Sequence, residues 1–236
     1  MNKKAMALAL TVGLLGAGGV AQAGVIYSID TGSAGGIIGS TASDNDTSIW
    51  LNAFTVVAGG ELIDSIDIAF GVPPDNGGFG PANGTAATAY LWTSASNIPD
   101  PTVDATVASS VAGTVQSIGT NTFVNFSLPV PVQLSVGDVF FAGVQSTALA
   151  VGFDDKDSVT AGQQSWFFTD NTADPLDPDA LGDISVGGTF NSFSAFGDAL
   201  IRVNADAAAV PEPSTLAIFG IGSGVMGFVS IRRRRR

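Results

Sequence analysis

Residues 65–70 read S-I-D-I-A-F, and residues 123–128 read F-V-N-F-S-L. Large apolar side chains occupy every second position, for example Ile66, Ile68 and Phe70 in the first stretch. Successive side chains of a β-strand point to opposite faces, so this alternation is typical of a strand with one buried face. Both stretches therefore predict half-buried strands, and they indicate the fold class of the chain.

Similar strand patterns recur along the chain, and Gly- and Pro-rich turn signals separate them. No long stretch has helical periodicity, so parallel strands joined by crossover helices are not expected. We predict an all-β, antiparallel β-sandwich with a jelly-roll-like arrangement at residues 24–204, followed by a linker at 205–209. The further expected strands are 49–57, 87–93, 132–136, 139–144, 149–153, 165–169 and 200–203.

The body of the chain is strongly acidic. Residues 24–209 keep two basic residues, Lys156 and Arg202, against 20 of the 21 acids, a formal charge of −18. Such a body repels phosphate backbones, which excludes nucleic acid as a partner. An acidic surface also keeps an exported protein soluble, without any specific partner.

The chain contains neither cysteine nor histidine. This excludes disulfides, thiol nucleophiles, Ser-His-Asp catalysis and metal sites built on histidine or thiolate. We expect no cofactor and no enzymatic activity. The alternative is a hydrolase that uses a pair of carboxylates as general acid and base.

The C-terminal end combines three features in a fixed order. Residues 210–215 read V-P-E-P-S-T, residues 215–231 carry no charge, and five arginines end the sequence. A helix of 17 residues is about 25 Å long, near the short end of what spans a bilayer core. The positive-inside rule keeps the arginines in the cytoplasm and places the body outside. We therefore predict a transmembrane helix at 215–231, with a membrane stop at Arg232, Arg233, Arg234, Arg235 and Arg236.

This order of P-E-P triplet, apolar span and arginine cluster resembles the PEP-CTERM sorting signal of Gram-negative bacteria. The resemblance covers residues 210–236. It implies that an exosortase recognises Pro211, Glu212 and Pro213 and processes the tail near them. The alternative is a plain C-terminal membrane anchor.

The N-terminal end has the pattern of a secretory signal peptide. Lys3 and Lys4 precede an uncharged, largely apolar run, and Ala21 and Ala23 fit a small-x-small cleavage site. We predict that residues 1–23 are removed by signal peptidase, so that the mature chain begins at Gly24. The alternative is an uncleaved signal anchor.

Acidic loops provide a candidate calcium site. Calcium binds six to eight oxygen ligands, and closely spaced Asp side chains on loops supply them. Solvated acidic loops without a metal are the alternative. The candidate ligands are Asp154, Asp155, Asp157, Asp170 and Asp174.

Aromatic side chains provide a candidate sugar-binding face. Tyr90 and Trp92 alternate with Ala89 and Leu91 and therefore share one face of a strand. That face is either a platform on which sugar rings stack or the inside of the sandwich.

The body also resembles a group of exported bacterial β-sandwich domains that occur with interchangeable C-terminal anchors. The matching segments are A-F-T-V at 53–56, the strand at 66–70, A-Y-L-W at 89–92, L-S-V-G-D-V-F-F at 134–141 and L-I-R-V at 200–203. The resemblance implies a fold and a surface location, without an activity.

Together, these observations predict an exported protein with a structural or adhesive role. It passes through an inner-membrane-anchored precursor and reaches the cell surface or the extracellular matrix, where exopolysaccharide is an expected partner. The alternative functions are a carbohydrate-binding module of the matrix and a hydrolase.

Overall fold

The computed structural model describes residues 25–30, 32–39, 47–71, 82–147, 150–154, 165–170, 176–183, 190–191 and 198–206. This part of the chain is almost entirely β-structure, as the alternation predicts. Its helical segments are the single turn α1 (Pro101–Asp104) and the 3-10 turn η2 (Leu181–Asp183). The strands are β1 (Val25–Tyr27), β2 (Gly36–Gly39), β3 (Thr47–Thr55), β4 (Leu62–Ala69), β5 (Ala86–Ser94), β6 (Ala105–Thr114), β7 (Phe123–Gln133), β8 (Val139–Thr147), β9 (Ala150–Phe153), β10 (Ser165–Asp170), β11 (Phe190–Asn191) and β12 (Ile201–Asp206).

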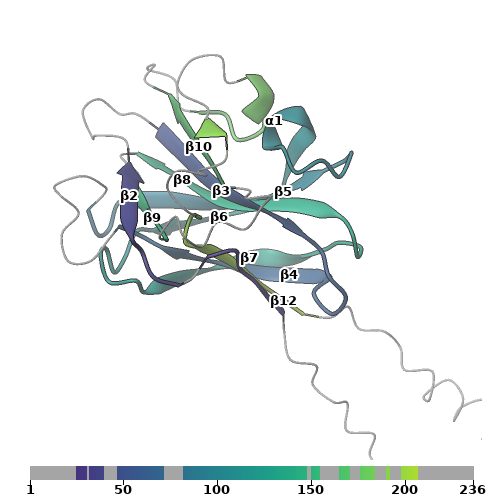
Figure 1. Cartoon of the computed structure of the whole chain (residues 1–236), viewed down its shortest axis with the longest axis horizontal. Helices are drawn as coiled ribbons and strands as arrows, with labels where there is room; N and C mark the ends of the chain where they lie inside the picture. The colour runs from purple at the N-terminus through teal and green to yellow at the C-terminus, as the bar shows by residue number, and fades with distance from the viewer. Residues whose placement is uncertain are drawn as a thin grey trace, which may run out of the picture.

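Two antiparallel sheets pack face to face as a sandwich (Figure 1). The four-stranded sheet has the order β1-β12-β4-β7, and the six-stranded sheet has the order β11-β10-β3-β8-β5-β6. A small third sheet pairs β2 with β9. The chain passes between the two large sheets from β3 to β4, from β4 to β5, from β6 to β7, from β7 to β8 and from β11 to β12. Most contacts that hold the layers together are therefore distant in sequence.

The core lies between the two sheets and is built by the alternating residues. Ile66, Ile68 and Phe70 are buried, and Phe126 and Leu128 of the neighbouring strand β7 join them in the same core. Three aromatic rings pack together in this core, since Tyr27 contacts Phe54 and, edge to face, Phe140. Apolar burial of this extent is the dominant stabilising contribution to the fold.

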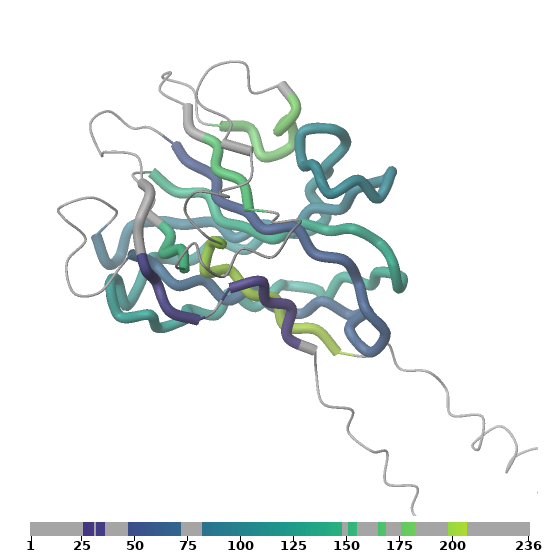
Figure 2. The backbone as a smooth tube through the Cα atoms, in the orientation of Figure 1, coloured from purple at the N-terminus to yellow at the C-terminus, as the bar shows by residue number. Residues whose placement is uncertain are grey.

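The first and last strands of the body, β1 and β12, are neighbours in the four-stranded sheet. Val25 of β1 pairs with Ala205 of β12, so the two strands lie side by side (Figure 2). β12 runs to Asp206, two residues into the predicted linker, and Ala205 is buried. Among the described residues, both large sheets and their cores lie within residues 25–206.

Two strand predictions need correction. Residues 123–128 and 132–136 do not form separate strands, because β7 continues through Pro129 and Pro131 to Gln133 and ends there. Proline is tolerated in β7 because it is an edge strand, where one row of N–H groups has no ladder partner. β6, which the sequence patterns did not indicate, follows α1 and pairs with β5.

Candidate functional site

Several predicted site residues lie outside the described residues. These are the sorting residues Pro211, Glu212 and Pro213, the arginines 232–236, and the signal-cleavage residues Ala21 and Ala23. Within the described residues, no helix is long and apolar enough to cross a membrane, and the predicted span 215–231 lies beyond them.

The predicted calcium ligands are only partly described. Asp155, Asp157 and Asp174 lie outside the described residues, and Asp170 is described as the end of β10. Asp154 is fully buried, and its Oδ1 accepts a hydrogen bond of 2.7 Å from the N–H of Asp198. Among described residues no group of three or more acidic side chains is placed to hold a metal ion. The calcium site therefore remains a prediction.

A buried polar cluster lies beside Asp154. The hydroxyl of Ser165 donates to Asn52 Oδ1 at 2.6 Å and accepts from the N–H of Ala199 at 3.2 Å. The Asn52 amide donates to the carbonyls of Ala199 and Ile201. Asn52 and Ser165 are 0% exposed, so this cluster joins β3, β10 and the start of β12 and has no surface to offer a substrate.

The tryptophans do not form an exposed platform. Trp92 and Tyr90 share one face, as predicted, and their rings stack with centroids 5.3 Å apart. That face is neither the inside of the sandwich nor an open surface, so both alternatives for it were wrong. It is the outer side of the six-stranded sheet, where Trp92 is 0% exposed in a second apolar cluster. The other members include Ile49, Leu51, Phe141, Trp166, Phe168, Leu176 and Leu181.

The second cluster is closed by the segment around η2 and by α1, which lie on the outer side of the six-stranded sheet (Figure 1). The indole Nε1 of Trp92 donates to the carbonyl of Pro178 at 2.8 Å. Burial raises the pKa of the Tyr90 phenol. Asp104, at the end of α1, accepts hydrogen bonds from the Ser96 N–H and the Ser94 hydroxyl, which lower the pKa of its carboxyl.

The outer face of the four-stranded sheet carries a row of polar side chains that are hydrogen-bonded to one another, which we call the polar ladder. Asp67 on β4 is its centre, because its Oδ1 accepts from Asn125 Nδ2 at 2.7 Å and its Oδ2 accepts from Asn204 Nδ2 at 2.9 Å. Ser127 donates to Asn125 Oδ1 at 2.8 Å, and Asn204 also donates to Ser65 Oγ at 3.1 Å. The ladder consists of Ser65, Asp67, Asn125, Ser127 and Asn204.

The strand register explains why these residues meet. Asp67 is paired with Asn125 on β7 and with Arg202 on β12, and Ser65 is paired with Ser127 and Asn204. Directly opposed side chains on one face of an antiparallel pair lie about 4.5–5.5 Å apart at Cβ. The same register that buries Ile66 and Ile68 therefore places the ladder on the outer face.

An ion pair borders the ladder. Arg202 makes a two-pronged contact with Asp30, in which Nη2 lies 2.6 Å from Oδ1 and Nε lies 3.1 Å from Oδ2. The Asp30 side chain is 0% exposed, whereas that of Arg202 is 28% exposed. The guanidinium also lies over the ring of Phe123, 4.1 Å from its centroid.

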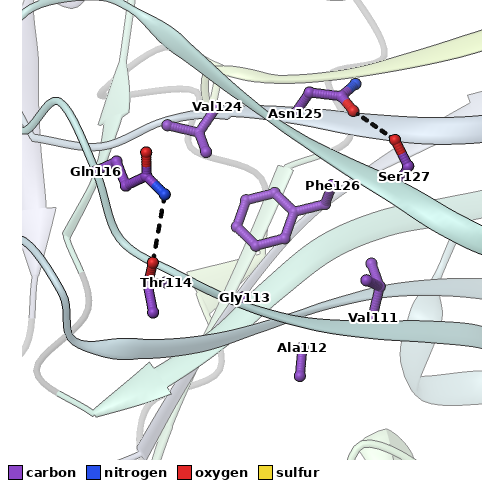
Figure 3. A pocket seen from close by; sticks show the side chains of 9 residues that line it. All are labelled: Val111, Ala112, Gly113, Thr114, Gln116, Val124, Asn125, Phe126 and Ser127. Carbon is purple, nitrogen blue, oxygen red and sulfur yellow. Dashed lines mark hydrogen bonds between the residues drawn. The ribbon is translucent and has the colours of Figure 1, made fainter.

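A groove of about 430 Å³ adjoins the ladder where the edges of the two sheets face each other (Figure 3). The ring of Phe126 reaches from β7 across it, and a Cβ at Gly113 of β6 would lie 2.6 Å from that ring. Thr114 and Gln116 on one side and Asn125 and Ser127 on the other make the rim polar.

This arrangement suits the recognition of hydroxyl groups. Amides and carboxylates form directed hydrogen bonds, and the ladder holds them in place through bonds to one another. A carboxylate offers about four acceptor positions, and the two bonds from Asn125 and Asn204 use only part of the capacity of Asp67. The exposed Asn125 and Ser127 stand beside the groove, where an extended ligand has access to both.

Sequence reasoning missed the ladder. The alternation at 65–70 and 123–128 already indicates that the side chains of Asp67, Asn125 and Ser127 point away from the core. The missing information was that β4 lies between β7 and β12, which places these side chains in one row.

Comparison with known proteins identifies the C-terminal end. Residues 209–235 match the family model described as the PEP-CTERM protein-sorting motif. No curated protein matches the chain. Among solved structures, a similar one contains the cysteine protease and lectin-like domains of Cwp84, a surface-layer-associated protein of Clostridium difficile. The identity is 14% and the TM-score 0.49, with 78% of this chain and 36% of that chain covered.

The chain spans about a third of that structure, and a likeness at this level says nothing about a ligand or an activity. The sorting motif carries more information, since proteins with this motif are exported and processed by an exosortase. This chain therefore carries the PEP-CTERM sorting signal of exported proteins that an exosortase processes.

Proposed function

We propose that the mature protein is a structural or adhesive component of the cell surface or extracellular matrix. In this proposal residues 1–23 direct export, residues 215–231 hold an inner-membrane precursor, and processing near 211–213 releases the β-sandwich. The match to the sorting motif supports this route. The sandwich is taken to be jelly-roll-like, and it acts by binding, without catalysis.

Intact-mass spectrometry of the protein from its native host tests the route. We expect a chain that begins at Gly24 and ends within 211–214 in the outer-surface or medium fraction. Cleavage at these points removes both terminal segments, so the mature protein consists of the acidic β-sandwich. A chain that retains residues 232–236 in the inner-membrane fraction would instead indicate a plain anchor.

We propose further that the polar ladder is the adhesive surface and that its ligand is a neutral, hydroxyl-rich polysaccharide. The observation that carries this proposal is the hydrogen-bonded row centred on Asp67. The formal charge of −18 in the body disfavours a polyanionic ligand, because like charges repel at low ionic strength. Hydroxyl groups of a neutral polymer, in contrast, both donate to Asp67 and accept from Asn125.

The ladder is tested by binding of the purified protein to exopolysaccharide from its native host. Replacing Asn125 with alanine removes one hydrogen-bonding group and leaves the carboxylate of Asp67 without one partner. We expect the Kd to rise about 3- to 10-fold, the loss that corresponds to about 0.7–1.4 kcal/mol. Asp67→Asn, which keeps the shape but removes the charge, should have at least this effect.

Thr106→Ala is the matched control, because Thr106 is exposed on β6, in the other sheet. It should bind as the unchanged protein does. Equal affinities for all four proteins would show that the ladder does not contact the polysaccharide. A loss in Thr106→Ala as large as in Asn125→Ala would equally contradict the assignment.

A further inference from the structure

The two sheets end in strands that differ in how well they are protected. Among the described residues, β11 spans two residues and β1 spans three, so both offer little to pair with. β7 is long but contains Pro129 and Pro131, which lack the N–H that a neighbouring strand needs. β6 spans ten residues, with neither proline nor a charged side chain. Long edge strands without such protection are templates for pairing with another chain.

The backbone hydrogen bonds between β6 and β5 show which N–H and C=O groups of β6 point outward. The N–H of Val115 donates to the carbonyl of Thr85, at the end of the pairing with β5. Because the direction alternates along an antiparallel strand, Thr114, Ala112 and Ser110 direct their N–H and C=O groups away from β5. Their side chains are exposed as well. The register shift of the β5–β6 pair lies before this segment, so Ser109 to Thr114 form a regular edge.

The charge pattern indicates what this edge can meet. The sequence has no charged residue between Asp104 and Asp138, a stretch that includes β6 and β7. The body carries its formal charge of −18 on the remaining residues. The side of the sandwich formed by β6 and β7 is therefore the side on which two copies can approach without opposing carboxylates.

We propose that β6 pairs antiparallel with β6 of a second copy of this chain. An antiparallel strand pair is self-complementary, so a two-fold axis matches the donors of Ser110, Ala112 and Thr114 with acceptors of the same segment in the other copy. The six-stranded sheets then join into one continuous sheet across the dimer. This contact goes beyond the proposed adhesion, because it uses the other sheet and does not require the polar ladder.

The test is sedimentation velocity of a chain of residues 24–206, which contains every strand of both large sheets, over a concentration series. We expect a monomer–dimer equilibrium that shifts toward the dimer when salt rises from about 0.05 to about 0.5 M, because screening weakens the repulsion between the acidic copies. Ala112→Pro removes an outward N–H from β6, as Pro129 and Pro131 do in β7, and should raise the dimer Kd at least tenfold. Its circular dichroism should match that of the unchanged protein, because proline there removes an N–H that points away from β5.

Ala112→Ser is the control for Ala112→Pro, since it keeps the backbone N–H, and it should dimerise normally. Ser110→Glu tests the edge without touching the backbone. It places two like charges near the axis and should also raise the Kd at least tenfold at low salt. A monomer at every concentration would overturn the proposal. Unchanged dimerisation of Ser110→Glu, or dissociation at high salt, would also overturn it.

Discussion

Replacing Trp92 with alanine is expected to lower the free energy of unfolding by about 3–5 kcal/mol, the range for large-to-small changes of buried aromatic residues. Trp92 is 0% exposed, packs in the second apolar cluster, and donates a hydrogen bond to the Pro178 carbonyl. The change would leave a cavity beneath the η2 segment and an unmatched carbonyl. Urea denaturation followed by circular dichroism measures the effect.

Tyr90→Phe is the control on the same face, because it removes only the hydroxyl that donates to Gln145 Oε1 at 3.1 Å. We expect a loss of about 0.5–1.5 kcal/mol, the net contribution of one hydrogen bond. The comparison separates a packing residue from a sugar platform. If Trp92 contacted a ligand, Trp92→Ala would abolish binding while leaving the unfolding midpoint unchanged, and our assignment of Trp92 to the core would be wrong.

Replacing Arg202 with alanine is the second change with a large expected effect. It leaves the carboxylate of Asp30 buried without its cation, and removing one partner of a buried ion pair costs about 3–5 kcal/mol. Because the Arg202 side chain is 28% exposed, water compensates in part, and we expect about 2–4 kcal/mol. The contact with the Phe123 ring is lost as well. The same denaturation measurement applies.

The double variant Asp30→Ala/Arg202→Ala is the informative control. It removes the buried charge together with its partner, so we expect it to be more stable than Arg202→Ala alone. If the double variant instead loses the sum of the two single losses, the two residues contribute independently. In that case the ion pair would not stabilise the contact between β12 and the segment that precedes β2.

Much of the fold could be predicted because burial repeats every second residue. Ile66, Ile68 and Phe126 face the core, as the alternation predicts. β6 escaped prediction for a physical reason. The register shift between Leu91 and Trp92 pairs Val107 with Trp92 on the outer face and Val111 with Ala89 on the inner face. Val107 and Val111 are four residues apart, so a regular strand would place them on the same face, yet they lie on opposite faces. The two-residue alternation is therefore interrupted within β6.

The candidate site was less accessible to sequence analysis. Asp67 and Asn125 are separated by 58 residues, and only the adjacency of β4 and β7 brings them together. For Trp92, alternation assigned the correct strand face but did not reveal what covers it. The covering segment, with Leu176 and Leu181, follows far later in the chain.

Some properties of this protein follow from short stretches of its sequence alone. The order of the C-terminal motif specifies export and sorting, composition excludes cysteine and histidine chemistry, and the two-residue period specifies a sandwich. These signals are carried by neighbouring residues, so no folding is needed to read them. The order of strands, the second apolar cluster, the polar ladder and the unprotected edge of β6 arise only when the chain folds. Each of these depends on which strands become neighbours, and in an antiparallel sandwich that is settled by contacts between residues far apart in the chain.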